Sequence, residues 1–104
     1  DRKLGHILDV DGALIGIDHG LTFHPDDKLR TVLWVFAGVT LPRSVVAALD
    51  RLAVALEAGL AARIGGALGV QSRVAFESRL AGLRKAGVHP DPPEDRPPLP
   101  WPLY

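Results

Sequence analysis

The stretch "HILDVDGALIGIDHG", residues 6–20, decides the fold of this chain. Two runs of strand-forming residues flank Asp11-Gly12, and Asp-Gly is a strong signal for a two-residue hairpin turn because both turn positions need a positive φ. That turn predicts three pairs of facing residues: Val10 with Ala13, Leu8 with Ile15, and His6 with Ile17. The sequence therefore predicts an antiparallel hairpin over residues 6–18 that returns Asp18 to the neighbourhood of His6.

The same stretch allows a phosphatase interpretation. "ILDVDGAL" is similar to the first motif of haloacid-dehalogenase-type phosphatases, in which Asp9 would be the nucleophile and Asp11 the general acid/base. However, Ala13 stands in the place of the Thr of that motif, and no Lys or acidic pair follows on a later strand end. That fold also needs a parallel sheet, and no further strand is predicted after residue 18. A turn explains Asp11-Gly12 better than catalysis does.

Helices are predicted after the hairpin. Residues 19–27 form a loop, and Asp26 or Asp27 caps a short helix through "KLRTVLWVF" that ends near Gly38. Pro42 opens a longer helix, which is broken at Gly65-Gly66 and Gly69. Its apolar stripe is Val45, Leu49, Leu52, Leu56 and Leu60. A last helix runs from about residue 70 to residue 86, with Gly87 as its C-cap. Its inward residues are Val70, Val74, Leu80 and Leu83.

The C-terminal segment is rich in proline. Residues 89–104 contain seven of the nine prolines, so they are predicted to be extended or polyproline-like rather than helical. Trp101 and Tyr104 are expected to pin this tail to the body. The chain is thus divided into residues 1–88 and a tail, residues 89–104.

Composition limits the classes of function. The 104 residues are enough for one domain, and 47% of them are hydrophobic, which favours a folded chain. Lys plus Arg and Asp plus Glu are both 12, so there is no electrostatic case for nucleic acid as a partner. The absence of Cys excludes a disulfide framework and a thiolate metal site. No apolar run is long enough for a membrane span, and we expect a cytoplasmic protein.

Two segments flanking the hairpin carry a resemblance to kinases. "DRKLGHI", residues 1–7, precedes it, and "IDHG", residues 17–20, follows it. This order resembles phosphatidylinositol 3- and 4-kinases, in which Asp-Arg-His-x-x-Asn precedes a hairpin and Ile-Asp-Phe-Gly follows. With "GIDHGLTFHPDDKLRTVLWVFAG", the Arg-rich last helix and the Pro-Trp-Pro ending, the chain resembles an actinobacterial phosphatidylinositol 3-/4-kinase-like family over essentially its whole length.

The resemblance implies an α+β fold, mostly α. It would be the C-terminal part of a protein-kinase-like lobe, with a β-hairpin, about three helices within residues 28–86 and an extended tail. The catalytic loop would be residues 1–6, and the metal-binding loop residues 18–27.

The resemblance also implies functional residues. Asp1 would be the catalytic Asp, and Asp18 the main Mg²⁺ ligand. His6 stands where lipid kinases have a metal-binding Asn. Because Mg²⁺ prefers oxygen ligands, His6 is expected either to contact phosphate or structure instead, or to alter the metal preference. The candidate ligands of substrate or phosphate are Lys3, Lys28 and Arg30.

Each of these residues has a simpler interpretation beside the functional one. Asp is common after strands, so Asp18 is alternatively a cap at the end of the hairpin, and His6 a strand-end residue without a ligand role. Lys28 and Arg30 are alternatively part of a solvated helix face. A transition-metal hydrolase site would use His6, Asp18, His19 and His24, but the last two lack the i, i+4 spacing of a helical metal pair.

The function implied is an ATP- and Mg²⁺-dependent phosphotransferase whose phosphoacceptor is unknown. The phosphate-covering loop and the phosphate-contacting Lys of such enzymes lie upstream of the matched segment, and the chain starts with Asp and has no Met. We therefore expect a fragment that is inactive alone and binds ATP poorly. The alternative is a non-catalytic kinase-like module that binds nucleotide or a partner protein, and His6 in place of Asn motivates it.

Overall fold

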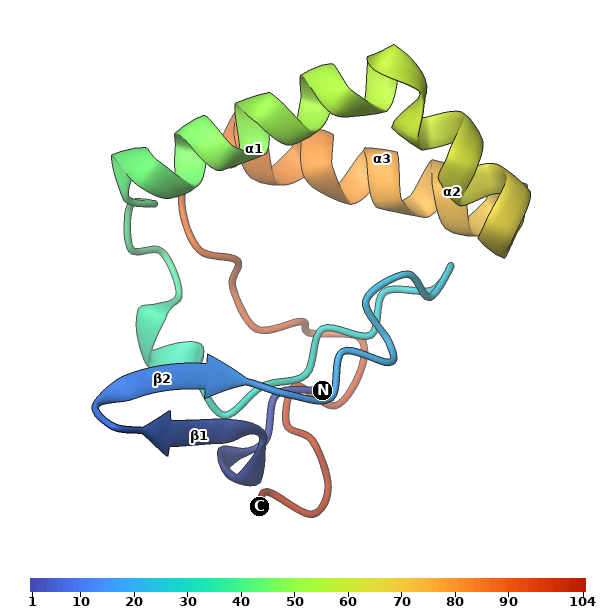
Figure 1. Ribbon diagram of the computed structural model, residues 1–104. Coiled ribbons are helices and arrows are strands. Elements are labelled where there is room, and N and C mark those ends of the chain that lie inside the picture. The colour runs from blue at the N-terminus through green and yellow to red at the C-terminus, as the bar shows by residue number, and fades with distance from the viewer.

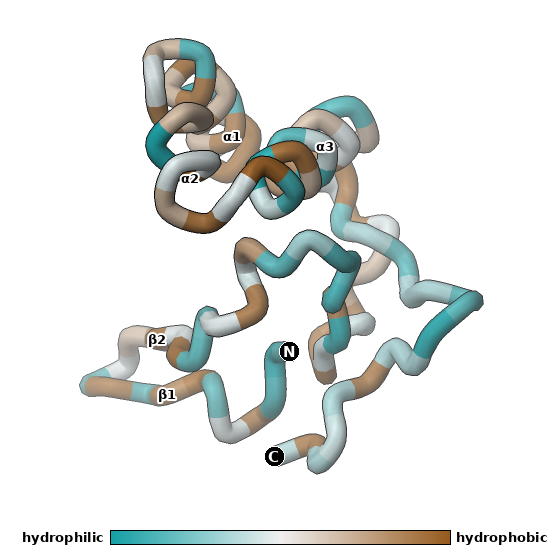
Figure 2. The backbone as a smooth tube through the Cα atoms, turned by 90° about the vertical axis from the view of Figure 1, so that its right-hand side faces the viewer, coloured by the Kyte–Doolittle hydropathy of each residue, from teal (hydrophilic) through white to brown (hydrophobic).

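The structure, a computed structural model, describes all residues from 1 to 104 and has two layers (Figure 1). One layer holds the helices α1 (Arg43–Ala55), α2 (Ala61–Leu68) and α3 (Val70–Ala86). The other holds the hairpin of β1 (Ile7–Val10) and β2 (Ala13–Gly16), the loops and the C-terminal tail (Figure 2). The prediction of a small α+β chain with an antiparallel hairpin followed by helices is confirmed. None of its helices combines the length and the apolar character that crossing a bilayer requires.

The hairpin has the predicted register. Val10 pairs with Ala13 and Leu8 with Ile15, and the amide of Ile17 donates to the carbonyl of His6 at 2.8 Å. Both turn residues have positive φ, 52° at Asp11 and 82° at Gly12, as an Asp-Gly turn requires.

The carboxylate of Asp9 belongs to this turn. Its Oδ1 accepts a hydrogen bond from the amide of Gly12 at 2.9 Å. Asp9 therefore stabilises the turn locally, at the end of the hairpin opposite to Asp18.

The helix predicted from residue 28 was wrong. Arg2 and Thr31 instead form a parallel bridge, in which the Arg2 amide donates to the Arg30 carbonyl at 2.8 Å. The Val32 amide donates back to the Arg2 carbonyl at 3.0 Å, and the only helical turn here is the 3₁₀ turn Trp34–Phe36. The β-branched Thr31 and Val32 suit an extended backbone, and pairing with a distant segment outweighs the local helix propensity.

The helical layer bends where the sequence analysis did not expect it. A wide π-type turn, Leu56–Leu60, joins α1 to α2, and Gly59 has a φ of 124° inside it. The predicted break at Gly65-Gly66 was wrong, because both glycines lie within α2. A Cβ on Gly65 would come within 3.2 Å of Arg73 Cδ, so this glycine allows α3 to approach α2 closely. The predicted break at Gly69 is confirmed by its φ of 93°.

The hydrophobic core lies among the helices. Leu56, Ile64 and Leu80 are its buried members, and Phe76 packs against them. The predicted inward positions Val70 and Val74 were wrong, since their side chains are 60% and 52% exposed. The buried residues of α3 are Ser72 and Leu80, with Phe76 partly buried between them, so a serine that the pattern did not predict faces inward. Gly87 ends α3 in the left-handed conformation, as predicted.

The C-terminal tail has no helix or strand and bends at residues 94–96, 99 and 101–102 beside the hairpin layer. Pro100 is fully buried, and the carbonyl of Pro98 accepts hydrogen bonds from Trp34 Nε1 at 2.8 Å and from the Thr31 amide at 3.1 Å. Proline lacks an amide donor but keeps its carbonyl acceptor, so the backbone of Pro98 can only accept hydrogen bonds. Trp101 and Tyr104 were wrongly expected to pin the tail, because they are 87% and 83% exposed.

Candidate functional site

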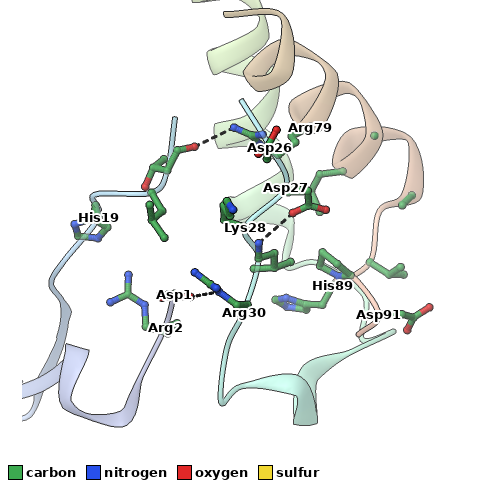
Figure 3. Close-up of a pocket in the computed structure, with 18 of the residues that line it drawn as sticks. Asp1, Arg2, His19, Asp26, Asp27, Lys28, Arg30, Arg79, His89 and Asp91 are labelled. Carbon is green, nitrogen blue, oxygen red and sulfur yellow. Dashed lines mark hydrogen bonds and ion pairs between the residues drawn. The ribbon is translucent and has the colours of Figure 1, made fainter. Parts of the chain in front are cut away.

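A cleft of ≈ 650 Å³ lies between the open end of the hairpin, the loop that follows it and α3 (Figure 3). Four of the six predicted site residues line this cleft: Asp1, Asp18, Lys28 and Arg30. The fold thus gathers residues from three separate parts of the chain around one cavity.

The backbone at Asp18 turns its side chain toward His6. A strictly alternating strand would place His6 and Asp18 on opposite faces of the sheet. Asp18 has a φ of 61°, in the left-handed region that non-glycine residues seldom adopt and that Asp tolerates better than most. The alternation ends there, and His6 Nε2 lies 3.3 Å from Asp18 Oδ2.

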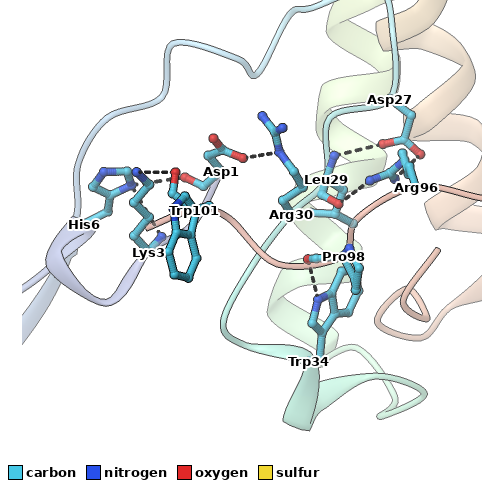
Figure 4. Close-up of polar contacts among 10 residues, drawn as sticks. All are labelled: Asp1, Lys3, His6, Asp27, Leu29, Arg30, Trp34, Arg96, Pro98 and Trp101. Atoms are coloured by element: carbon cyan, nitrogen blue, oxygen red, sulfur yellow. Dashed lines mark hydrogen bonds and ion pairs between the residues drawn. The ribbon is translucent and has the colours of Figure 1, made fainter. Parts of the chain in front are cut away.

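His6 links Asp18 to the N-terminal segment. Its second ring nitrogen, Nδ1, lies 3.1 Å from the main-chain carbonyl of Asp1 (Figure 4). One nitrogen therefore faces a carboxylate and the other a backbone oxygen. This is the arrangement of a side chain that orients a neighbouring carboxylate, and neither nitrogen is free for a metal ion.

Asp1 is paired with Arg30. Arg30 Nε lies 2.5 Å from Asp1 Oδ1, and both side chains are about one-third exposed (33% and 27%). Arg30 therefore neutralises the predicted catalytic carboxylate, and this cation is already engaged within the protein.

Arg2 braces the open end of the hairpin. Its Nη1 donates to the carbonyls of His6 at 3.1 Å and Ile17 at 2.6 Å, one on each strand side. Sequence reasoning missed this role, although Arg2 lies within the segment that carries the kinase resemblance. It holds the two strand ends at a fixed spacing, which fixes the positions of His6 and Asp18.

Lys3 and Lys28 lie in different surroundings. Lys3 Nζ approaches the carbonyl of Trp101 at 3.4 Å, and Lys3 does not line the cleft (Figure 4). Lys28 lines the cleft and is half-buried, and its ammonium group has no hydrogen bond or ion pair within the chain.

Arg79 of α3 is a further cleft residue. Its Nη2 donates to the carbonyl of Thr22 at 3.1 Å, which ties α3 to the loop after Asp18. Phe23 stacks on Phe76 beside this contact, with ring centroids 5.0 Å apart. The i, i+3 spacing of Phe76 and Arg79 was the available sequence signal, since it places both on one side of the helix.

The acidic residues of the cleft fit one particular kind of metal site. No group of three or more His, Cys, Asp or Glu side chains is arranged to hold a metal ion, so the four-residue hydrolase site is not assembled. Asp1 and Asp18 nevertheless both face the cleft. Mg²⁺ is commonly held by one or two carboxylates together with substrate phosphates. Asp1 and Asp18 therefore have the ligand chemistry that Mg²⁺ prefers, although Asp1 would first have to separate from Arg30.

Asp27 lines the cleft and connects it to the C-terminal tail. Its Oδ1 accepts from the Leu29 amide at 3.1 Å, and its Oδ2 lies 3.0 Å from Arg96 Nη2. Burial alone would raise the pKa of Asp27. The Leu29 amide and the Arg96 guanidinium outweigh burial and hold that pKa below its usual value.

We expect this pair to make stability depend on acid pH. Because the pKa of Asp27 is lower in the folded state, its contribution is complete above the unfolded value, about 3.9, and is lost as pH falls through the folded value. Thermal unfolding between about pH 3 and pH 6 should therefore show a smaller acid-induced drop in Asp27→Asn than in the parent. Asp26→Asn is the matched control and should keep the parental drop. Identical pH profiles for Asp27→Asn and the parent would contradict the assignment.

Comparison with known proteins gives one relative to report. The chain is 41% identical, over 105 aligned residues, to Protein Rv2133c of Mycobacterium tuberculosis (strain ATCC 25618 / H37Rv). The alignment covers 100% of this chain and 37% of that protein, so the chain spans little more than a third of the relative's length. No family model matches the chain, and no solved structure matches it.

Proposed function

We propose that these residues form the metal-binding side of an ATP- and Mg²⁺-dependent phosphotransferase that resembles phosphatidylinositol 3-/4-kinases, with an unassigned acceptor. The observation that carries the proposal is the meeting of Asp18, held by His6, and Asp1 at one cleft. Phosphoryl transfer depends on positioning and on charge stabilisation rather than on covalent help from the protein. Two carboxylates beside cations in one cavity supply these requirements.

The proposed roles follow from the contacts. Asp1 would orient the hydroxyl of the acceptor once it is released from Arg30, and Asp18 would hold Mg²⁺ when the nucleotide is bound. The metal ion supplies neutralisation of the phosphate charge. His6 keeps the Asp18 carboxylate turned into the cleft.

The exposed hairpin supports the idea that a further protein surface completes the site. Four apolar side chains on one hairpin face are 40–46% exposed: Leu8, Val10, Ile15 and Ile17. Both strands carry hydrophobic residues (Figure 2). The chain exposes 7359 Å², whereas a monomer of 11.1 kDa ordinarily exposes about 5700 Å². A two-stranded hairpin is also marginally stable without cover. We infer that the whole protein supplies this cover and the nucleotide-binding half, and that these 104 residues alone are inactive.

A second candidate function is a non-catalytic kinase-like module that binds nucleotide or a partner protein. Two observations favour it. Asp1 is neutralised by Arg30, and His6 occupies the position at which lipid kinases have a metal-binding Asn. Such a module would keep the cleft and bind ligand without transfer.

The test is phosphotransfer by the whole protein with Asp1→Asn. Because this change removes the carboxylate that would orient the acceptor, we expect kcat to fall by about 10²-fold or more while nucleotide affinity stays within about twofold. ATP turnover and nucleotide binding are measured together. Asp50→Asn is the matched control, since Asp50 pairs with Arg84 on the helical layer, away from the cleft. Equal turnover by Asp1→Asn and the parent would contradict the catalytic proposal and favour the non-catalytic binding module.

A further inference from the structure

We propose that Lys28 and Arg79 form a phosphate-binding subsite on the cleft wall. The proposal rests on the proposed function and deepens it. Two other cations of the cleft already have partners within the chain. Arg30 pairs with Asp1, and Arg2 donates to two backbone carbonyls. Lys3, which was expected to bind phosphate, does not line the cavity.

Lys28 is the unengaged cation of this cleft. It is half-buried, and its ammonium group meets no carboxylate or carbonyl of the chain. Its three N–H donors are therefore available to a bound anion.

Arg79 of α3 is the second cation of this side of the cleft. It is fixed by one hydrogen bond to the Thr22 carbonyl and has no carboxylate partner, so most of its five N–H donors are available. The stacking of Phe23 on Phe76 holds the loop against α3 at this point. Arg79 is therefore presented on a fixed support, and its planar fork matches phosphate geometry.

No neighbouring carboxylate forms an ion pair with Lys28 or Arg79. Asp27 pairs with Arg96 from the tail, Arg79 adds a smaller charge effect that lowers the Asp27 pKa, and Asp26 and Asp91 are exposed. Figure 3 shows Lys28 and Arg79 on the side of the cleft near Asp26 and Asp27, with Asp1 and Arg30 lower in the view. The cleft thus has an acidic part at Asp1 and Asp18 and a separate pair of available cations. The phosphate taken there belongs either to a phosphorylated acceptor or to the nucleotide.

The experiment is titration of the 104-residue chain with inorganic phosphate at low ionic strength, followed by NMR of the Arg79 Nε–H signal and the backbone amides of residues 22–30. We expect saturable binding that Lys28→Gln and Arg79→Gln each weaken about tenfold, because each removes a charge-assisted hydrogen bond. Lys85→Gln, an exposed charge on the same helix, is the matched control and should leave binding unchanged. Circular dichroism checks that each variant folds. If Arg79→Gln disturbs the loop that Arg79 holds, Lys28→Gln still tests the subsite.

Two outcomes overturn the subsite: no saturable phosphate binding, or equal weakening in the Lys85→Gln control. Competition then identifies the source of the phosphate. Displacement at lower concentration by glycerol 3-phosphate assigns the subsite to the acceptor, and displacement at lower concentration by Mg·ATP assigns it to the nucleotide. Because no turnover is measured, a failure of phosphotransfer by the whole protein leaves this result unaffected.

Discussion

Ending the chain after Arg96 should lower the free energy of unfolding by about 4 kcal/mol. The truncation removes both hydrogen bonds to the Pro98 carbonyl, the bond from the Leu4 amide to the Leu103 carbonyl, and the buried ring of Pro100. Each hydrogen bond contributes about 1 kcal/mol, and the donors left behind are partly buried. Denaturant unfolding of the truncated and the parent chain measures the difference.

The same truncation should release the N-terminal segment. The Leu4 amide donates to the Leu103 carbonyl of the tail. Arg2 exchanges main-chain hydrogen bonds with Arg30 and Val32, and the amide of Thr31 between them donates to the tail. We therefore expect faster hydrogen exchange of the amides of Arg2, Leu4 and Val32 than in the parent. The matched control is Trp101→Ala, which changes an exposed tail side chain and keeps the backbone contacts. It should shift stability by less than about 0.5 kcal/mol. A truncated chain as stable as the parent would show that the tail is not part of the fold.

Asp18→Asn should reduce phosphotransfer by the whole protein on the order of 10³-fold. The substitution keeps the size of the side chain and an oxygen that can accept from His6 Nε2. It removes the negative charge that Mg²⁺ requires. Asn is also well tolerated at positive φ, so the backbone at 61° is not strained by the change. Steady-state ATP turnover, with circular dichroism as the check on folding, measures the effect.

Asp9→Asn is the matched control for Asp18→Asn. Both are carboxylates of the same hairpin, but Asp9 caps the turn and does not line the cleft. The Asp9→Asn substitution should leave phosphotransfer unchanged. Hydrolysis of p-nitrophenyl phosphate that disappears in Asp9→Asn would instead support the phosphatase alternative. If Asp18→Asn keeps full turnover, Asp18 has no role in metal binding.

The contact between His6 and Asp18 shows which part of the site the local sequence pattern predicts. The order of residues 1–20 predicted that both would come to one end of the hairpin, since a two-residue turn fixes the register. It did not predict that His6 would point at Asp18, because alternation assigned them to opposite faces. The left-handed backbone of Asp18 decided that contact.

The sequence by itself determined the hairpin turn, its register and the end of α3 at Gly87, because each depends on the φ preference of one or two residues and on short-range periodicity. Only the tertiary structure decided the extended course of residues 28–33, the pairing of Arg30 with Asp1 and the path of the tail. These features depend on partners far apart in the chain, such as Arg30 with Asp1, 29 positions away, and Lys3 with Trp101, 98 positions away. Local propensity contains no information about such partners, and the free energy of the distant contacts outweighs it.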